Sequence, residues 1–335
     1  MLHSGKMQEL AEQISKTQLE ILAIQEIKWS GTGLIKKQNY SLYYSGHSSK
    51  TGQAGTGFIF LKKMQNYVIG FEPYNERLCK LQLKGKYNNN TLINVYAPTE
   101  DHTEEIKEQF YDDLQYLLDE TSKNDIIIIL GDVNAQLGKE RLYNEVIGQH
   151  TLHEETNING ELLCEFACAN NMVVMSTNFQ HKRIHKITWL SPDQNTASLI
   201  DHIIINANKK GVIEDVKTMR GPNIDSDHFL VKAVIKQKLS VMHKKKLKPA
   251  LKWNKVNLQN PSKLMEYRSL LHTKLINLVP KQEINDEWEQ IKTTIVDAAR
   301  GVIQIQGTPP RNEWWDEECK KIIQEKNEAR KNGYN

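Results

Sequence analysis

A carboxylate and an amide, Asp132 and Asn134, stand directly after the most apolar run of this chain. The run belongs to the segment Asp125–Asn134, whose sequence is DIIIILGDVN. Consecutive branched aliphatic residues over so short a length are typical of a strand that is covered on both faces. Gly131 lets the backbone turn, and the two-residue spacing places Asp132 and Asn134 on the same side while the chain stays extended. Because Asp and Asn are also frequent in ordinary turns, this segment alone leaves a reactive site and a plain turn equally open.

Four other segments place polar residues of the same chemical kind where an apolar strand emerges. They contribute Glu26 in AIQEIKW, Tyr96 in NVYAPTE, Asp201 in LIDHIII, and Asp227 with His228 in DSDHFLV. Each of these side chains is a hard oxygen ligand, a hydrogen-bond donor or a proton carrier. Turn residues follow strands in all proteins, but five such segments in one domain are hard to obtain by chance. We therefore expect these side chains to converge and to form a reactive site.

The elements that must position these residues follow from the periodicity of the apolar residues. Helical spacing predicts helices over 6–19, 103–120 and about 160–170. Strand-like segments are more numerous and cover 19–26, 56–63, 79–85, 91–98, 125–134, 172–177, 187–190, 198–205 and 228–236. The segment Lys84–Asn90 has the composition of a hairpin turn. Strands outnumber helices and many are joined by hairpins, which departs from a doubly wound parallel sheet.

The pattern changes near residue 240. A basic run, HKKKLK at 243–248, is followed by three segments with helical spacing, 261–279, 283–306 and 312–333, the last of which carries Trp314 and Trp315. We expect a first domain over 1–238 and a basic, mainly helical tail over 239–335. The tail shows no glycine-rich phosphate loop, no His/Cys cluster and no carboxylate pair. The basic run is interpreted as a linker, with a nuclear-import or nucleic-acid patch as the alternative.

Composition narrows the class of protein. The chain has 335 residues, 39% of them hydrophobic, which supports a sizeable core. No stretch has the apolar length of a membrane span, and the N-terminus does not have the pattern of a signal peptide. The four cysteines, at 79, 164, 168 and 319, are expected to be core thiols in a reducing, intracellular compartment. Residues 241–335 contain 18 Lys/Arg and 12 Asp/Glu, whereas the remainder contains 26 and 29, so a basic rear follows an acidic front.

Several motifs in this order resemble the endonuclease/exonuclease/phosphatase family, and most closely the apurinic-endonuclease-like domain of non-LTR retrotransposons and its domesticated craniofacial development protein relatives. The motifs are QEIKW, INVYAPTE, ILGDVNAQLG, TWLSPD, LIDHIIIN and DSDHFLVKA, and the resemblance covers residues 5 to about 238. The fold that it implies is an α/β four-layer α/β/β/α sandwich of two mixed sheets, followed here by a helical tail. The segment NEWWDEECKKIIQEKNEAR of the tail resembles the linker that precedes a reverse transcriptase.

The resemblance also implies a role for each candidate residue. Glu26 resembles the principal ligand of a Mg²⁺ ion, which Mn²⁺ could replace, and Asp227 resembles a residue close to that metal. Asp132 resembles the residue that orients or deprotonates the attacking water. Asn134 and Tyr96 resemble donors to the phosphate oxygens. His228 resembles the active-site histidine and Asp201 its hydrogen-bonded orienter, which fixes the tautomer and raises the basicity of the ring.

Neighbouring residues receive different interpretations. His202 follows Asp201 on a strand, points to the opposite face and is predicted to be structural. Trp189 is expected to pack in the core, whereas Lys28 and Trp29 are expected to face a nucleic-acid backbone.

The chain departs from the family at its start and before Asp201. The opening MLHSGK resembles the residues that follow an N-V-R-like motif of the first strand, so we expect that strand and its Asn to be absent, as in a truncated copy of a retrotransposon reading frame. Ser198 and Leu199 stand where the relatives tend to place Asn and Gln.

The expected function is Mg²⁺-dependent nicking of double-stranded DNA by a retrotransposon-derived endonuclease. The expected location is the nucleus, with no membrane contact and with RNA of the parent element as a further partner. The alternative is a catalytically impaired, domesticated protein that binds nucleic acid or protein partners through its tail. A small-molecule phosphatase of the same superfold is the third hypothesis.

Overall fold

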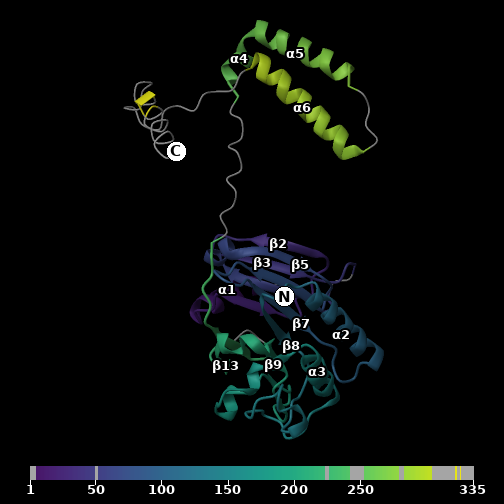
Figure 1. Ribbon diagram of the computed structural model, residues 1–335, viewed down its shortest axis with the longest axis vertical. Coiled ribbons are helices and arrows are strands. Elements are labelled where there is room, and N and C mark those ends of the chain that lie inside the picture. Colours follow the sequence, from purple (N-terminus) through teal and green to yellow (C-terminus); the bar gives the residue numbers. More distant parts are fainter. Residues whose placement is uncertain are drawn as a thin grey trace, which may run out of the picture. The chain divides into compact units, whose positions relative to one another are not determined.

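A computed structural model of the protein describes residues 5–49, 52–222, 226–241, 253–278 and 283–303, together with 321, 322 and 325. The chain divides into two compact units, Met1–Met242 and His243–Asn335, and the boundary expected from the sequence lies close to this division. Figure 1 shows the strands gathered in the first unit and helices in the second. The basic run 243–248 and nearly all of the helix expected over 312–333, including Trp314 and Trp315, lie outside the described residues.

The first unit contains three α-helices and fourteen strands among its described residues. The helices are α1 (Lys6–Lys16), α2 (Glu104–Asp119) and α3 (Ile158–Ala169), with short 3-10 helices η1 (Lys62–Tyr67), η2 (Arg141–Tyr143), η3 (Met175–Thr177), η4 (Arg183–His185) and η5 (Ala207–Val212). The strands are β1 (Ile21–Ile24), β2 (Thr32–Lys36), β3 (Tyr40–Ser45), β4 (Thr56–Leu61), β5 (Val68–Pro73), β6 (Leu78–Leu83), β7 (Asn90–Tyr96), β8 (Ile126–Asp132), β9 (Met172–Val174), β10 (Trp189–Leu190), β11 (Ala197–Ser198), β12 (Asp201–Asn206), β13 (Ile213–Met219) and β14 (Leu230–Ile235).

Two main sheets form the centre of this unit. A six-stranded mixed sheet has the order β5-β6-β7-β8-β12-β9, in which β7 and β8 run parallel and the other neighbours antiparallel. A four-stranded antiparallel sheet has the order β1-β4-β3-β2. The pairs β13–β14 and β10–β11 form two-stranded antiparallel ribbons. The hairpin predicted at Lys84–Asn90 joins β6 to β7.

Three hydrophobic cores stack these elements into four layers. Leu10 and Ile14 of α1 pack with Leu42 and Ile59 on the outer face of the four-stranded sheet. A second core fills the space between the sheets and includes residues of β4, β6, β7, β8, β12 and β13. A third core joins the other face of the six-stranded sheet to α2 and α3. The expected α/β/β/α sandwich is therefore confirmed, but in the described part of the chain only the six-stranded sheet is mixed, and the four-stranded sheet is antiparallel throughout.

The apolar run that precedes Asp132 shows why β8 lies at the centre. Side chains of a strand alternate between faces. Ile126 and Ile128 enter the core between the sheets, whereas Ile127 and Ile129 enter the core beneath α2 and α3. The prediction of a strand that is covered on both faces is confirmed.

Some expectations for single elements were wrong or incomplete. Strands β2, β3, β5 and β13 were not predicted; β2 is exposed at alternate positions, so its short sequence TGLIK carries little apolar signal. Cys79 and Cys164 are buried, as expected of core thiols, but the expectation is wrong for Cys168, which is exposed although it lies only one turn beyond Cys164 in α3. Cys319 lies outside the described residues.

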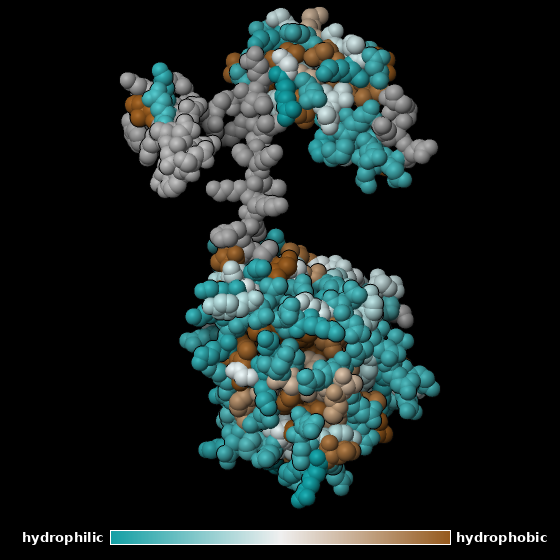
Figure 2. All heavy atoms as spheres, in the orientation of Figure 1, coloured by the Kyte–Doolittle hydropathy of each residue, from teal (hydrophilic) through white to brown (hydrophobic). Residues whose placement is uncertain are grey.

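The second unit consists of helices α4 (Lys255–Gln259), α5 (Pro261–Ile276) and α6 (Ile284–Val302) in its described part. Pro261 occupies the first turn of α5, where no backbone N–H is lost, and the Asn260 side chain accepts a hydrogen bond from the N–H of Ser262. Met265 and Trp288 are largely exposed, and Figure 2 shows hydrophobic residues at the surface of these helices. None of the helices in the described part of the chain is both long and apolar enough to span a bilayer.

Candidate active site

The register of the six-stranded sheet places three of the candidate residues side by side. Tyr96 at the end of β7 is paired with Asp132 at the end of the parallel strand β8. Asp132 is in turn paired with Asp201 at the start of the antiparallel strand β12. Parallel strands end at the same edge of a sheet, and an antiparallel neighbour begins there. The expected convergence of these residues is therefore what the strand pairing produces.

His228 completes this row from the residues that precede β14. Its Nδ1 lies 3.0 Å from Oδ2 of Asp201, and its Nε2 lies 3.9 Å from Oδ2 of Asp132. Burial alone would lower the pKa of His228, but the hydrogen bond and the charge of Asp201 outweigh it and raise that pKa to about 9. Burial and the nearby Asp201 charge raise the pKa of the Asp132 carboxyl. The site therefore holds an imidazolium between two carboxyl groups at neutral pH.

Glu26 lies just beyond β1 and joins this group through Tyr96. The Tyr96 hydroxyl donates to its Oε1 at 2.8 Å, and the Lys28 ammonium lies 2.8 Å from its Oε2. Burial opposes ionisation of Glu26, but the hydrogen bonds from Lys28 and Tyr96 outweigh it and lower the pKa of the carboxyl. Burial and the bond to Glu26 raise the pKa of the Tyr96 hydroxyl, which stays a proton donor.

A buried amide network fixes the end of β1 above the six-stranded sheet. Asn94, in β7, donates from Nδ2 to the carbonyl of Ile24 at 2.9 Å and to that of Gly57 at 2.8 Å. The Gln25 side chain donates to Oδ1 of Asn94 at 2.6 Å. These bonds hold the residue next to Glu26 in place. Nothing in the local sequence marks Asn94 beyond its position two residues before Tyr96.

The expectation that Asn134 extends the strand beyond Asp132 is wrong. Asn134 has φ +51°, a left-handed conformation, and its N–H donates to Oδ1 of Asp132 at 3.0 Å. Its side chain donates to the carbonyl of Ala97 at 2.9 Å. The chain turns at this point because the short Asp side chain captures the N–H two residues on. Asn134 thus stays at the site edge, where it ties the loop after β8 to the loop after β7.

Asp227 and Trp189 form a pair at the edge of the site. The Trp189 indole donates to Oδ2 of Asp227 at 2.9 Å, and Trp189 forms an isolated bridge with His228. Trp189 is partly exposed, so the expectation that it packs in the core is wrong. Trp29, expected to face nucleic acid, instead packs with the core under α1 and meets the Tyr44 ring edge-on.

The fit of a metal rests on Glu26. Over the residues that the structure describes, no group of three or more His, Cys, Asp or Glu is placed to hold a metal ion, so Glu26 and Asp227 do not belong to a ready-made cage. Mg²⁺ needs only one or two carboxylates when waters and substrate phosphates supply the other ligands. The Glu26 carboxylate is half-exposed and already pairs with a cation through Oε2. The residues present therefore fit a metal that is held by Glu26 together with a bound phosphate.

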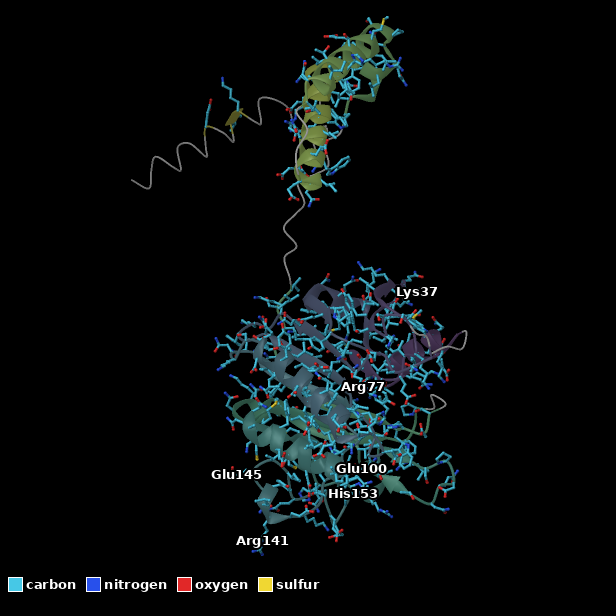
Figure 3. All side chains as sticks on the ribbon, turned by 90° about the vertical axis from the view of Figure 1, so that its right-hand side faces the viewer. Lys37, Arg77, Glu100, Arg141, Glu145 and His153 are labelled. Carbon is cyan, nitrogen blue, oxygen red and sulfur yellow. The ribbon has the colours of Figure 1, made fainter. Side chains whose placement is uncertain are left out.

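Arg77 is a member of this site that the sequence analysis missed. Its carbonyl accepts the N–H of Tyr96 at 2.9 Å, its guanidinium donates to the Tyr96 carbonyl at 3.2 Å and lies 5.4 Å from the centre of the Tyr96 ring. Among the described residues, no carboxylate forms an ion pair with it, and Figure 3 labels it near the middle of the view of this unit. Arg77 precedes β6, and an antiparallel strand begins where its neighbour ends. A search for residues after strands therefore passes over it.

His202 is structural, as predicted. It is fully buried, its Nδ1 lies 2.7 Å from the Ser176 hydroxyl, and its Nε2 lies 2.9 Å from the Ala135 carbonyl. Burial lowers its pKa to about 4, so the ring is neutral. It supports the loop after Asp132 from the face opposite the site.

Comparison with known proteins agrees with this arrangement. Residues 4–228 match the model of the Endonuclease/Exonuclease/phosphatase family. The chain is 33% identical over 243 residues to craniofacial development protein 2 of Tragulus javanicus and of Bos taurus; the match covers 72% of this chain but 42% and 40% of those proteins. The catalytic domain of Xenopus laevis APE2 has a similar fold, with a TM-score of 0.53 at 18% identity over 72% of this chain and 90% of that domain.

The chain belongs to the endonuclease/exonuclease/phosphatase family. It is also 35% identical over 134 residues to exodeoxyribonuclease III of Haemophilus influenzae, a match that covers 36% of this chain and 49% of that protein. The family and these relatives support a nuclease or phosphodiesterase function.

Proposed function

We propose that the chain is a Mg²⁺-dependent endonuclease, active also with Mn²⁺, that nicks one strand of double-stranded DNA. The observation that carries the proposal is the position of His228, whose ring lies 3.0 Å from Asp201 and 3.9 Å from Asp132. Glu26, Tyr96 and Arg77 lie at the same edge of the sheets. Phosphodiester cleavage needs a positive charge that stabilises the phosphate, a base that activates the attacking water and a ligand that binds the metal. This edge of the sheets has a residue for each of these roles.

The residues of the chain divide this work according to their charge states. The raised pKa of His228 keeps its ring protonated at neutral pH, so it acts as a cation that faces the phosphate. Asp132 is buried and its raised pKa makes its ionised carboxylate a stronger base, which suits a group that takes a proton from the attacking water. Tyr96 is held by Glu26 and Arg77, so its position near the phosphate is fixed. A Mg²⁺ ion at Glu26 would supply further charge stabilisation when bound.

The motif sequences resemble those of retrotransposon endonucleases and therefore favour DNA over a small phosphate ester as the substrate. A retrotransposon origin of the chain is part of the same proposal. A nuclear location and contact with RNA of the parent element follow from that origin. The second candidate function is a catalytically impaired protein that binds nucleic acid or protein. It is favoured by one observation, namely that the described residues contain no ready-made group of three or more metal ligands.

Nicking of supercoiled plasmid separates these functions. The full chain should convert supercoiled to open-circular DNA with Mg²⁺ or Mn²⁺ and should stop with a chelator, while His228→Ala should abolish the conversion. Binding of DNA without any nicking would support the impaired protein instead. Release of phosphate from inositol phosphates without nicking would identify a phosphatase.

A further inference from the structure

A second positively charged surface lies beside the site, on residues that the proposed chemistry does not use. Its centre is an open hollow of about 520 Å³ lined by Gln180, His181, Lys182 and His185. All four lining side chains are polar or basic. We define the η4 surface as this hollow together with its basic neighbours, which are Arg183, Lys186, Lys217 and Arg220.

Three polar contacts connect the η4 surface to β13 and to the residue that follows it. His181 lies with Nε2 2.6 Å from Oδ1 of Asp215, and His185 lies with Nδ1 3.0 Å from the Thr218 carbonyl. Arg220 donates from Nε to the Ile184 carbonyl at 2.8 Å. The contacts follow one another from Asp215 to Arg220, which is about 17 Å of extended strand. The basic side chains are therefore spread along a line rather than gathered at one point.

This line begins at the active site. The Arg220 guanidinium lies 3.7 Å from the centre of the Phe229 ring, and Phe229 follows His228 directly. The N–H of Phe229 donates to the Thr188 carbonyl at 2.7 Å, which joins the chain after η4 to the residue next to His228. A polyanion that places one phosphate at His228 would continue over Arg220 toward His185 and Lys182.

The charge of the η4 surface is largely uncompensated. Among the residues that the structure describes, Asp215 is the acidic residue that pairs with members of this surface, through His181 and Lys217. Lys182 and Arg183 are exposed and form no ion pair within the described ranges. Lys186 is partly desolvated, and burial with the charge of Lys139 lowers the pKa of its ammonium group. An anionic partner would relieve this repulsion.

We propose that the η4 surface binds the sugar-phosphate backbone of duplex DNA on one side of the scissile phosphate. This proposal rests on the proposed nuclease function and adds the direction in which the substrate leaves the site. A backbone fits because phosphates recur every few ångströms along a strand, whereas a single small anion would leave most of these cations unpaired. Lys182 and Arg183 contribute binding energy only, because they do not contact the residues at the reacting phosphate.

The test measures duplex binding as a function of salt. The full chain, Lys182→Gln/Arg183→Gln, and the control Lys209→Gln/Lys210→Gln are titrated with a fluorescent DNA duplex in chelator, so that no nicking occurs. The control removes the same charge from η5, which follows the end of β12 opposite Asp201. Each phosphate contact contributes about 0.9 to the slope of log Kd against log salt, so loss of two contacts should reduce the slope by about 1.8. The control should keep the wild-type slope, and kcat for nicking at saturating DNA should be unchanged in both variants.

The outcomes separate this proposal from the nuclease function. Equal slopes for the double variant and the control would overturn the η4 surface while leaving nicking by the wild type as evidence for the enzyme. A reduced slope in a chain that never nicks would support the surface and reject the nuclease. No duplex binding by the wild type at low salt, or tighter binding of a matched RNA duplex, would overturn the assignment to DNA.

Discussion

Glu26 shows how single residues in this site are held under constraint. It has φ +51° and Lys28 has φ +64°, so two non-glycine residues adopt a left-handed conformation within three positions. Each such conformation costs on the order of 1–3 kcal/mol and persists where the surroundings enforce it. The enforcing contacts are the Asn94 amide at Ile24 and the pairing of the Ile27 and Lys28 N–H groups with the carbonyls of Gly55 and Ala54. In this conformation the Glu26 carboxylate accepts the hydrogen bond from the Tyr96 hydroxyl.

Replacing the Glu26 carboxylate tests its assignment as the metal ligand. Glu26→Gln keeps the shape and the bond from Tyr96 but removes the charge, so metal-dependent nicking should fall by about 100-fold or more, the effect of losing one charge-stabilising group in an active site. Circular dichroism should show an unchanged fold. Nicking at the wild-type rate would rule out Glu26 as the ligand.

The pair His228–Asp201 should behave as one unit. His228→Ala and Asp201→Asn should each lower kcat by about 100-fold to 10,000-fold, the range for a general acid, a base or its orienter. The double variant should be little worse than His228→Ala, because residues that act together are not additive. Losses that multiply would show that the two side chains act independently, despite the 3.0 Å contact.

The same pair predicts a dependence of stability on pH. The pKa of His228 is raised to about 9, above the value of about 6.5 in an unfolded chain. A raised pKa stabilises the folded state fully below the unfolded pKa, and this contribution is lost as pH rises through the folded pKa. Asp201→Asn should remove most of it. In urea unfolding, the free energy of unfolding of the wild type should exceed that of this variant by up to about 3 kcal/mol near pH 6. The difference should be much smaller above pH 9. A difference that does not change with pH would contradict this origin.

At the scale of elements, β8 depends on one glycine just before Asp132. Gly131 has φ +138°, and a Cβ there would lie 2.1 Å from the carbonyl oxygen of Val95 in the neighbouring strand β7. The parallel pairing of these strands aligns Tyr96 with Asp132. A side chain at 131 would separate the two strands at the site.

Gly131→Ala should therefore destabilise the fold by about 3 kcal/mol, the upper range for strained backbone, and should lower nicking as well. Gly70→Ala is the matched control, since Gly70 lies in β5 and a Cβ there meets nothing within 4 Å. The control should be neutral or slightly stabilising. Thermal unfolding of both variants gives the comparison, and equal melting temperatures would show that β7 and β8 tolerate the methyl group.

At the scale of the first unit, β1 and β14 have an open edge in the same layer. In the described part of the chain, β1 pairs with β4 only and β14 with β13 only. Both cover the core between the sheets, with Ile21 and Val231 among the partly buried residues that pack on it. Neither strand is fully buried, although both are rich in aliphatic residues. An additional strand that paired with both would bury these residues and satisfy their edges.

We expect a strand with an N-V-R-like motif, added before Met1, to occupy this position. It should raise the melting temperature through strand pairing and apolar burial, and it should increase nicking through its Asn. Replacing that Asn with Ala in the extended chain should keep the stability and lose the gain in rate. If the extension changes neither property, the edges of β1 and β14 do not take up a strand.

Much of the fold could be predicted because its signals are local. The alternation of buried isoleucines in β8, the helical spacing of Phe110, Leu114 and Leu117 in α2 and the hairpin between β6 and β7 each depend on a few consecutive residues. The strand β2 carries too little apolar alternation for such a prediction. Strand order also could not be predicted, because pairing partners are chosen by packing between residues far apart in the chain.

The sequence by itself determined which chemical groups the site contains. It marked Glu26, Tyr96, Asp132, Asp201 and His228 because each follows or begins an apolar strand. Only the tertiary structure decided which of them meet. The Tyr96 hydroxyl reaches Glu26 across 70 positions of sequence, and His228 reaches Asp201 across 27. Arg77 joins the site because an antiparallel strand begins beside Tyr96, whereas the Asn94 side chain reaches from β7 to the end of β1 in the other sheet. Local periodicity predicts the face of the strand or helix on which a side chain lies. The register of whole sheets determines which residue is its neighbour on that face.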